Sequence, residues 1–344
     1  MKIRKIILEN EIYLWLIFLS LALGIFSYLN RDNLEIARVD EVFKERISQF
    51  EEITPQDFVK NIEENIYVSY LFKINFLIGF FVFVFGIYLC LLFLSKLFKR
   101  NVSLFSQNFP EAGWQVIDIF RVIVVIVFFI NFLKVIEPVF LKTFEVDLFV
   151  YFIVRVFLFD IFCLGVIFYF VFKKYRLTFY NLGLKLDNFI NNLLIVFPHY
   201  IGIIPVLFLT VIITFFLTDF FKYKPEISPL FYFFFLPQPK YLIFFTAVFI
   251  AIIGPVIEEV FFRGFCYPAL RKRFGPLKAM FLVSFFFALL HMNVIGFLPI
   301  FTLGLLLVYL YEKTNSLISP IGLHILHNSL ILYLIFLYRM VFLK

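Results

Sequence analysis

The sequence predicts an all-α protein, a polytopic membrane helix bundle of about eight transmembrane helices, on two observations. First, 63% of the 344 residues are hydrophobic, only 16% are charged, and the mean hydropathy is +0.98. A soluble domain is about half apolar and about a quarter charged, and it could not bury this much apolar surface. Second, the apolar residues fall in long runs, and a helix of about 20 apolar residues spans a bilayer. This excludes an ordinary soluble enzyme, a disordered chain and a disulfide scaffold.

The apolar runs give the expected helices in order. They lie near 11–29, 66–95, 116–136, 146–172, 191–217, 241–263, 277–293, 297–312 and 318–340. The run at 297–312 is short, so we expect it to be tilted or to span only part of the bilayer, which leaves eight or nine helices. The first run follows a basic start, as in a signal peptide, but no small-residue cleavage site follows it, so it is interpreted as a retained helix.

Lysine and arginine lie mostly at the ends of these runs, where they anchor helices and set their orientation. Their placement predicts a multi-pass protein of the cell membrane with a cytoplasmic N-terminus and with the acidic loop 31–65 outside. The net charge of +7 therefore reflects membrane anchoring. The lipid bilayer is an expected partner and nucleic acid is not.

Four segments are expected along the chain. Residues 1–30 form an N-terminal membrane helix, 31–65 a small outer helical loop, 66–239 a membrane scaffold and 240–344 a catalytic membrane core. Within the outer loop, Thr54 and Pro55 are typical of a helix start, and an amphipathic helix is expected before them. In the scaffold, two sets of intramembrane charges are interpreted as neutralising ion pairs. They are Asp118 with Arg121, and Arg155 with Asp160.

The sixth run ends in two adjacent carboxylates, Glu258 and Glu259, followed by Arg263. A charged group in a membrane helix costs about 2.5–3.5 kcal/mol on insertion scales, so such groups are the first place to look for function. Glu259 and Arg263 have the i,i+4 order that favours an ion pair. Glu258 is turned about 100° away. It is therefore left to face something else, such as a water molecule that it could deprotonate.

Polar residues also appear on two later runs. His291 ends the seventh run, and the last run carries His324, His327 and Asn328 within one turn. His324 and Asn328 share a helix face at i,i+4 spacing. Polar groups on three membrane helices are hard to explain by packing alone, and together they predict a buried catalytic constellation.

The order of these motifs resembles the CPBP family of intramembrane proteases, which are CAAX prenyl endopeptidase-like and bacteriocin-processing-like (Abi). The motifs are Glu258-Glu259-x-x-x-Arg263, Phe287-x-x-x-His291 and His324-x-x-x-Asn328, within about residues 240–335. The resemblance implies an endopeptidase that hydrolyses a peptide bond of a membrane-associated or lipidated peptide or protein.

The resemblance also implies roles for single residues. Glu258 would activate a water, His291 would position it, and His324 and Asn328 would stabilise the oxyanion, as neutral donors. Glu259 and Arg263 would be structural. His327 is an addition to the motif, and it is interpreted as a supporting or core residue, with metal ligation as the alternative.

Three alternatives stay open. Zinc could be held by Glu258, His291 and His324, although the same residues suffice without metal and no cofactor is expected. Intramembrane Glu, His and Arg residues also serve as proton relays in transporters. Finally, the chain could be a non-catalytic membrane scaffold or immunity protein that retains the site.

Overall fold

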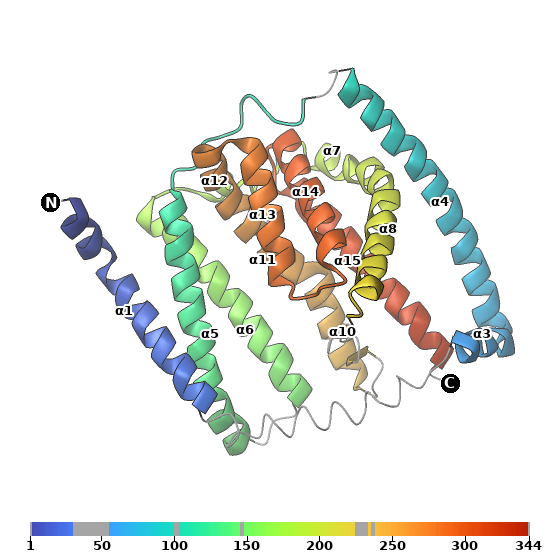
Figure 1. Cartoon of the computed structure of the whole chain (residues 1–344), viewed down its shortest axis with the longest axis horizontal. Helices are drawn as coiled ribbons and strands as arrows, with labels where there is room; N and C mark the ends of the chain where they lie inside the picture. Colours follow the sequence, from blue (N-terminus) through green and yellow to red (C-terminus); the bar gives the residue numbers. More distant parts are fainter. Residues whose placement is uncertain are drawn as a thin grey trace. The chain divides into compact units, whose positions relative to one another are not determined.

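A computed structural model describes residues 2–29, 55–99, 103–144, 148–223, 233–234 and 238–342. Within these ranges every regular element is a helix and no strand occurs, which confirms the predicted all-α class (Figure 1). The chain divides into two compact units. Unit 1 comprises Met1–Ile53 and Gln115–Arg176, and unit 2 comprises Thr54–Trp114 and Leu177–Lys344. The predicted catalytic segment, 240–344, therefore lies in unit 2 together with residues 54–114 and 177–239.

Unit 1 is built on two long helices that pack side by side, α1 (Lys2–Leu29) and α5 (Val116–Phe144). Two hydrogen bonds cross their interface: Arg121 donates to Asn10 at 2.9 Å, and Asn131 donates to Ser20 at 2.9 Å. The third helix, α6 (Leu148–Phe168), continues into the π-helix η2 (Tyr169–Lys174).

Two clusters of charges in unit 1 are paired. The predicted pair of Asp118 with Arg121 is confirmed at 2.8 Å, and Lys174 adds a second cation at 2.5 Å from the fully buried carboxylate. Arg155 contacts Glu137 of α5 at 3.1 Å, a partner that the sequence analysis did not name. Paired charges of this kind are what a membrane interior tolerates.

Unit 2 carries the longest helical stretch, 240–274, which is continuous but changes its helical type four times. Its parts are α10 (Lys240–Val248), the π-helix η4 (Phe249–Ile253), α11 (Gly254–Glu259), the π-helix η5 (Val260–Cys266) and α12 (Tyr267–Phe274). Around it lie α3 (Pro55–Glu64), α4 (Ile66–Phe98), η3 (Phe179–Leu182), α7 (Phe189–Leu194), α8 (Val196–Phe220), α13 (Pro276–Leu290), α14 (Phe297–Thr314) and α15 (Ile318–Phe342).

Eight helices in the described ranges are long and apolar enough to cross a membrane, and each coincides with a predicted run. Helix α14, with 18 residues, is just long enough by length and composition to cross a membrane, and its expected tilt or partial span stays a prediction. The short helix is α13, whose 15 residues rise about 22 Å against a hydrocarbon layer of about 30 Å.

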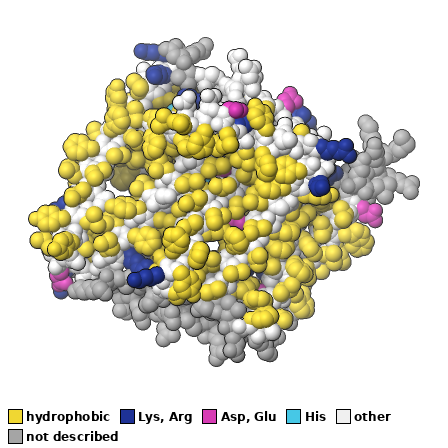
Figure 2. Space-filling view, turned by 180° about the vertical axis from the view of Figure 1, so that it is seen from behind, with side chains coloured by type: hydrophobic (Ala, Val, Ile, Leu, Met, Phe, Trp, Pro, Cys, Tyr) yellow, Lys and Arg dark blue, Asp and Glu magenta, His cyan; other side chains and the backbone are white. Residues whose placement is uncertain are grey.

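The outer faces of these helices are apolar. In α4, only 6% of the residues in the most apolar stretch are buried, and the same fraction holds for the span 189–220. Large side chains such as Phe76 (77% exposed) and Phe216 (70% exposed) point outward. The face shown in Figure 2 is accordingly covered mainly by hydrophobic side chains. Exposed apolar surface on this scale fits lipid contact, and the chain is a multi-pass membrane protein.

The predicted outer helical loop is described only in its second half. Helix α3 begins at Pro55 with Asp57 in its first turn, which confirms the predicted helix start there. Thr54 and the amphipathic helix expected before it lie outside the described residues.

Helices α4 and α8 approach closely at Gly86, which is buried. A Cβ atom on Gly86 would lie 2.5 Å from the backbone oxygen of Ile201 and 3.0 Å from the ring of Pro205. Glycine is therefore required there by the neighbouring backbone, as is common where membrane helices pack tightly.

We expect Gly86→Ala to lower the thermal unfolding midpoint of the protein in detergent micelles, because overpacking of this kind costs about 1–3 kcal/mol. Gly79→Ala is the matched control, since it lies in the same helix with no atom within 4 Å of its Cβ position. The control should leave the midpoint unchanged or raise it slightly through helix propensity. Equal midpoints for the two variants would contradict the close approach.

Candidate active site

Two prolines shape the helix that carries the glutamate pair. Pro255 and Pro268 are each the second residue of an α-helical part, and each follows a π-helix. Proline has no N–H to donate, and its ring crowds the carbonyl four residues earlier, which disturbs the preceding turn. Glu258 and Glu259 therefore end a six-residue α segment with π-helices on both sides.

The predicted ion pair of Glu259 with Arg263 is confirmed. Arg263 Nη1 donates to Glu259 Oε1 at 2.9 Å, and both side chains are fully buried. Arg263 also donates to the Gly304 carbonyl of α14 at 3.2 Å, and its guanidinium lies 4.4 Å from the ring centre of Phe287. Three kinds of contact thus compensate the burial of this cation.

The same carboxylate oxygen also holds His324. Nδ1 of His324 lies 2.8 Å from Glu259 Oε1, and the ring is 3% exposed. A carboxylate only accepts hydrogen bonds, so Nδ1 carries the proton. The sequence analysis gave Glu259 a structural role only, whereas the structure shows that Glu259 also orients a predicted catalytic histidine.

Glu258 has different surroundings from Glu259. Its side chain is 38% exposed, and Oε2 lies 3.8 Å from His324 Nε2. Among the described residues, this buried oxygen atom has no hydrogen-bond partner. Buried polar atoms without partners are costly and concentrate where an outside molecule is bound.

Phe287 packs against the residues of all three motifs. His291 ends α13 and is exposed, and its Nδ1–H donates to the Phe287 carbonyl at 2.7 Å. This leaves Nε2 of a neutral His291 as an acceptor. The Phe287 ring is fully buried, 4.7 Å from the ring of His291 and 5.6 Å from that of His324. The structure therefore groups His291 and His324 around one aromatic ring.

Asn328 ties α15 to the first π-helix, because its Nδ2 donates to the Ile250 carbonyl at 2.9 Å. That carbonyl lacks its ordinary helical donors: Gly254 gives its N–H to Phe249, and Pro255 has none. Asn328 thus compensates a carbonyl that the proline leaves without a partner.

His327 lies close to Tyr200 of α8. The hydroxyl of Tyr200 is 3.0 Å from Nδ1 of His327, and Tyr200 is buried. This contact is consistent with the supporting role predicted for His327, and the histidine's part in any reaction stays a prediction.

Residues 240–330 match the family model described as type II CAAX prenyl endopeptidase Rce1-like. All the residues of the three motifs lie within this range. This part of the chain is therefore similar to the CPBP family that the three motifs resemble. We call residues 240–330 the CPBP segment.

One curated relative is the "Putative membrane peptidase YdiL" of Bacillus subtilis, with 27% identity over 81 residues. The match covers 24% of this chain, and the chain spans only about a third (33%) of that relative's length. No solved structure gives a significant match.

The hydrogen bond to Glu259 decides which hydrogen bonds the other ring nitrogen of His324 can make. Because Nδ1–H is bound to Glu259, a neutral His324 would present a lone pair at Nε2 and could not donate from that atom. A protonated His324 could. With both glutamates ionised and Arg263 positive, a protonated His324 also brings the cluster to zero net charge, which suits a buried site. The oxyanion role predicted for His324 therefore requires its cationic form, where the sequence analysis assumed the neutral one.

The alternative zinc set of Glu258, His291 and His324 was tested on this geometry. Within the described part of the chain, no three His, Cys, Asp or Glu side chains converge as a metal site would require. Zinc ligation by these residues therefore stays a prediction.

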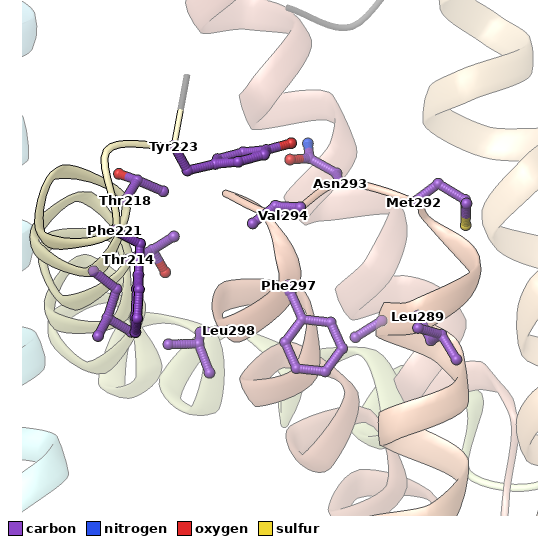
Figure 3. Close-up of a pocket in the computed structure, with 12 residues that line it drawn as sticks. Thr214, Thr218, Phe221, Tyr223, Leu289, Met292, Asn293, Val294, Phe297 and Leu298 are labelled. Carbon is purple, nitrogen blue, oxygen red and sulfur yellow. The ribbon is translucent and has the colours of Figure 1, made fainter. Parts of the chain in front are cut away.

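A pocket of about 700 Å³ opens beside the chain that follows His291 (Figure 3). Its walls come from the C-terminal end of α8 and from the end of α13 and the start of α14, and they are almost wholly apolar. They include Thr214, Leu217, Thr218, Phe221, Tyr223, Leu289, Met292, Asn293, Val294, Phe297 and Leu298. Residues on both sides of His291 line it, so an apolar ligand there would lie near the predicted catalytic histidine.

Sequence reasoning missed the irregular helix geometry around the glutamates. The two prolines at 255 and 268 were the available signal, because a proline within a long apolar run disturbs the turn before it. No sequence signal pointed to Tyr200, Ile250 or the partner of Glu259 on α15, since these contacts join distant parts of the chain.

We expect the buried Glu259–Arg263 pair to dominate local stability. Arg263→Met and Glu259→Gln should each lower the free energy of unfolding in detergent by about 3–5 kcal/mol, because each leaves buried polar groups uncompensated. The double variant should be more stable than the sum of the two losses predicts. Thermal and denaturant unfolding would measure all four proteins.

The control is an exposed pair with the same spacing, Lys60 and Glu64, 4.0 Å apart. Lys60→Met should cost at most about 1 kcal/mol. Strict additivity of the two buried substitutions would refute the coupling.

Proposed function

We propose that this protein is an intramembrane endopeptidase that hydrolyses a peptide bond of a membrane-associated or lipidated peptide or protein. One observation carries the proposal: two adjacent carboxylates have opposite surroundings. Glu259 is fully buried and its Oε1 is bound by Arg263 and His324, whereas Glu258 is 38% exposed and neither residue donates a hydrogen bond to it. The match of the CPBP segment to a family model of prenyl endopeptidases supports the same proposal.

Glu258 would act as the general base. A water molecule gives its proton to the Glu258 carboxylate while its oxygen attacks the scissile carbonyl carbon. His291 would accept a hydrogen bond from the same water through Nε2, because its Nδ1–H is held by the Phe287 carbonyl. Fixing the tautomer in this way fixes which nitrogen faces the water.

The oxyanion that forms would be stabilised by two donors. One is Nε2–H of protonated His324, whose other N–H is bound to Glu259. The other is an N–H of Asn328: an amide nitrogen has two, and the contact with Ile250 uses one. The tetrahedral intermediate then collapses, the C–N bond breaks, and Glu258 returns its proton to the leaving amine. The products are a carboxylic acid and an amine.

The apolar part of the substrate would lie in the pocket next to His291. Its lining suits a hydrocarbon chain or apolar side chains, with the polar peptide bond turned toward Glu258. By the positive-inside pattern, we place the site toward the cytoplasmic side of the cell membrane, with the N-terminus cytoplasmic. No metal step is included in this mechanism.

We expect Glu258→Gln to reduce kcat for cleavage of a fluorogenic membrane-anchored peptide by at least about 10³-fold, because the amide cannot take the proton from water. KM and the unfolding midpoint should change little. Glu63→Gln, an exposed glutamate on α3, is the control and should retain full activity. Equal activity of Glu258→Gln and the wild type would eliminate the mechanism.

Variants of Glu258 also distinguish the peptidase from the two other function classes. If no peptide of a membrane-anchored library is cleaved and Glu258→Gln abolishes proton flux in vesicles, the protein is a transporter. If a cellular phenotype of gene loss is fully rescued by the Glu258→Ala, His291→Ala double variant, the protein acts as a scaffold or immunity factor.

We expect cleavage to survive removal of divalent metal. Dialysis against EDTA or 1,10-phenanthroline should change kcat less than about twofold, since the site's donors are engaged with one another. Loss of activity on dialysis, restored by added zinc, would show that the three predicted ligands rearrange to bind metal.

A further inference from the structure

The non-helical segment 103–114, which follows α4, forms several hydrogen bonds with residues of α12 and α14. The fully buried Glu312 of α14 accepts from the Ser106 backbone N–H at 2.8 Å and from Arg271 at 2.5 Å. Arg271 donates in turn to the Ser106 carbonyl at 2.7 Å, and Lys272 donates to the Ala112 carbonyl at 3.2 Å. A buried carboxylate thus holds both α12 and the segment.

The segment ends in Trp114, which is fully buried. Its indole lies on the ring of Phe265, with the centroids 5.2 Å apart and the planes 14° from parallel. Its Nε1–H donates to the Phe265 backbone carbonyl at 2.7 Å. That carbonyl belongs to η5, two residues after Arg263.

Both π-helices that flank the glutamates therefore receive an N–H from a side chain outside their own helix. Asn328 donates to Ile250 in η4, and Trp114 donates to Phe265 in η5. π-Helices are rare and are found mostly at functional sites, so a specific partner that holds one in place is informative. Asn328 belongs to the predicted catalytic residues, but Trp114 does not.

The register of η5 sets the direction of the glutamates. A π segment accommodates one residue more than the same length of α-helix, and one residue corresponds to about 100° of rotation. Arg271 and Tyr267 hold α12 through Glu312, so α12 cannot turn freely. If η5 changed to α-helical bonding, α11 would therefore rotate about the helix axis, because α12 is held. Glu258 and Glu259 would rotate with α11.

We propose that Trp114 is a positioning residue for the glutamate pair. Its indole N–H holds the Phe265 carbonyl and keeps η5 in its π register, which keeps Glu258 turned outward and Glu259 turned toward Arg263 and His324. The effect on cleavage rests on the proposed peptidase function, but the effect on register does not.

The test is Trp114→Phe, which keeps an aromatic ring on Phe265 and removes the N–H. The chain has two tryptophans, and Trp15 is 59% exposed, so Trp15→Phe is the matched control. We expect Trp114→Phe to lower kcat at least about tenfold with KM unchanged, because substrate binding does not depend on the direction of Glu258. Trp15→Phe should match the wild type.

A register measurement makes the test independent of catalysis. Glu258→Cys and Ile257→Cys are introduced separately, and the rate of maleimide labelling at each position is read by peptide mass. Position 258 is partly exposed and Ile257 is 6% exposed, so the first thiol should react much faster. In the Trp114→Phe background, we expect the ratio of the two rates to fall at least about fivefold, since α11 has turned.

Should Trp114→Phe fail to fold, the indole can be replaced by benzothienylalanine in the Trp15→Phe protein. That analogue has nearly the same shape, with sulfur in place of N–H. An unchanged labelling ratio would overturn the proposal and leave Trp114 as a packing residue, whatever happens to kcat. A changed ratio in a protein that never cleaves a peptide would uphold the positioning role and reject the peptidase function.

Discussion

One carboxylate oxygen, Oε1 of Glu259, joins the helices of the CPBP segment. It accepts from Arg263 of its own helix and from His324 of α15. Arg263 extends the contact to the Gly304 carbonyl on α14 and to the ring of Phe287 on α13. Four helices therefore meet at a buried ion pair. Because Arg263 and the Nδ1–H of His324 are both bound to Glu259, the neighbouring Glu258 accepts no hydrogen bond from either, which leaves it available for the proposed role of general base.

The irregular helix around this carboxylate is the second constraint. A straight α-helix over 240–274 would be incompatible with prolines at 255 and 268, and the chain accommodates them with two π segments. Side chains from outside the helix donate to a carbonyl of each π segment, Asn328 to Ile250 and Trp114 to Phe265. Strain held by surrounding structure is typical of functional sites. Here it determines which way two adjacent glutamates point.

The sequence predicted those features that depend on local spacing or on bulk hydrophobicity. The membrane helices follow from apolar runs, and the Glu259–Arg263 and Asp118–Arg121 pairs follow from helical periodicity, which brings i+3 and i+4 neighbours together. Contacts between helices could not be obtained this way. The bonds of Glu259 to His324, of Asn328 to Ile250 and of Arg155 to Glu137 depend on tertiary packing, which one sequence does not reveal. The length of α13 was missed because the apolar run continues beyond the point where the helix ends.

The charge balance of the site explains why this arrangement suits a membrane interior. With His324 protonated, the two glutamates are matched by His324 and Arg263, and the net charge is zero. In the proposed mechanism, Glu258 takes a proton from water and becomes neutral, and a negative charge appears on the oxyanion. The net charge is still zero, and the negative charge has only moved from the carboxylate to a position facing His324 and Asn328. In a medium that solvates charge poorly, a reaction that relocates charge among fixed partners requires less reorganisation than one that creates it.

A neutral His324 would leave the cluster with one uncompensated negative charge before the reaction and no donor at Nε2 during it. The contact of Nδ1 with Glu259 thus links the orientation of His324, its charge and its proposed role.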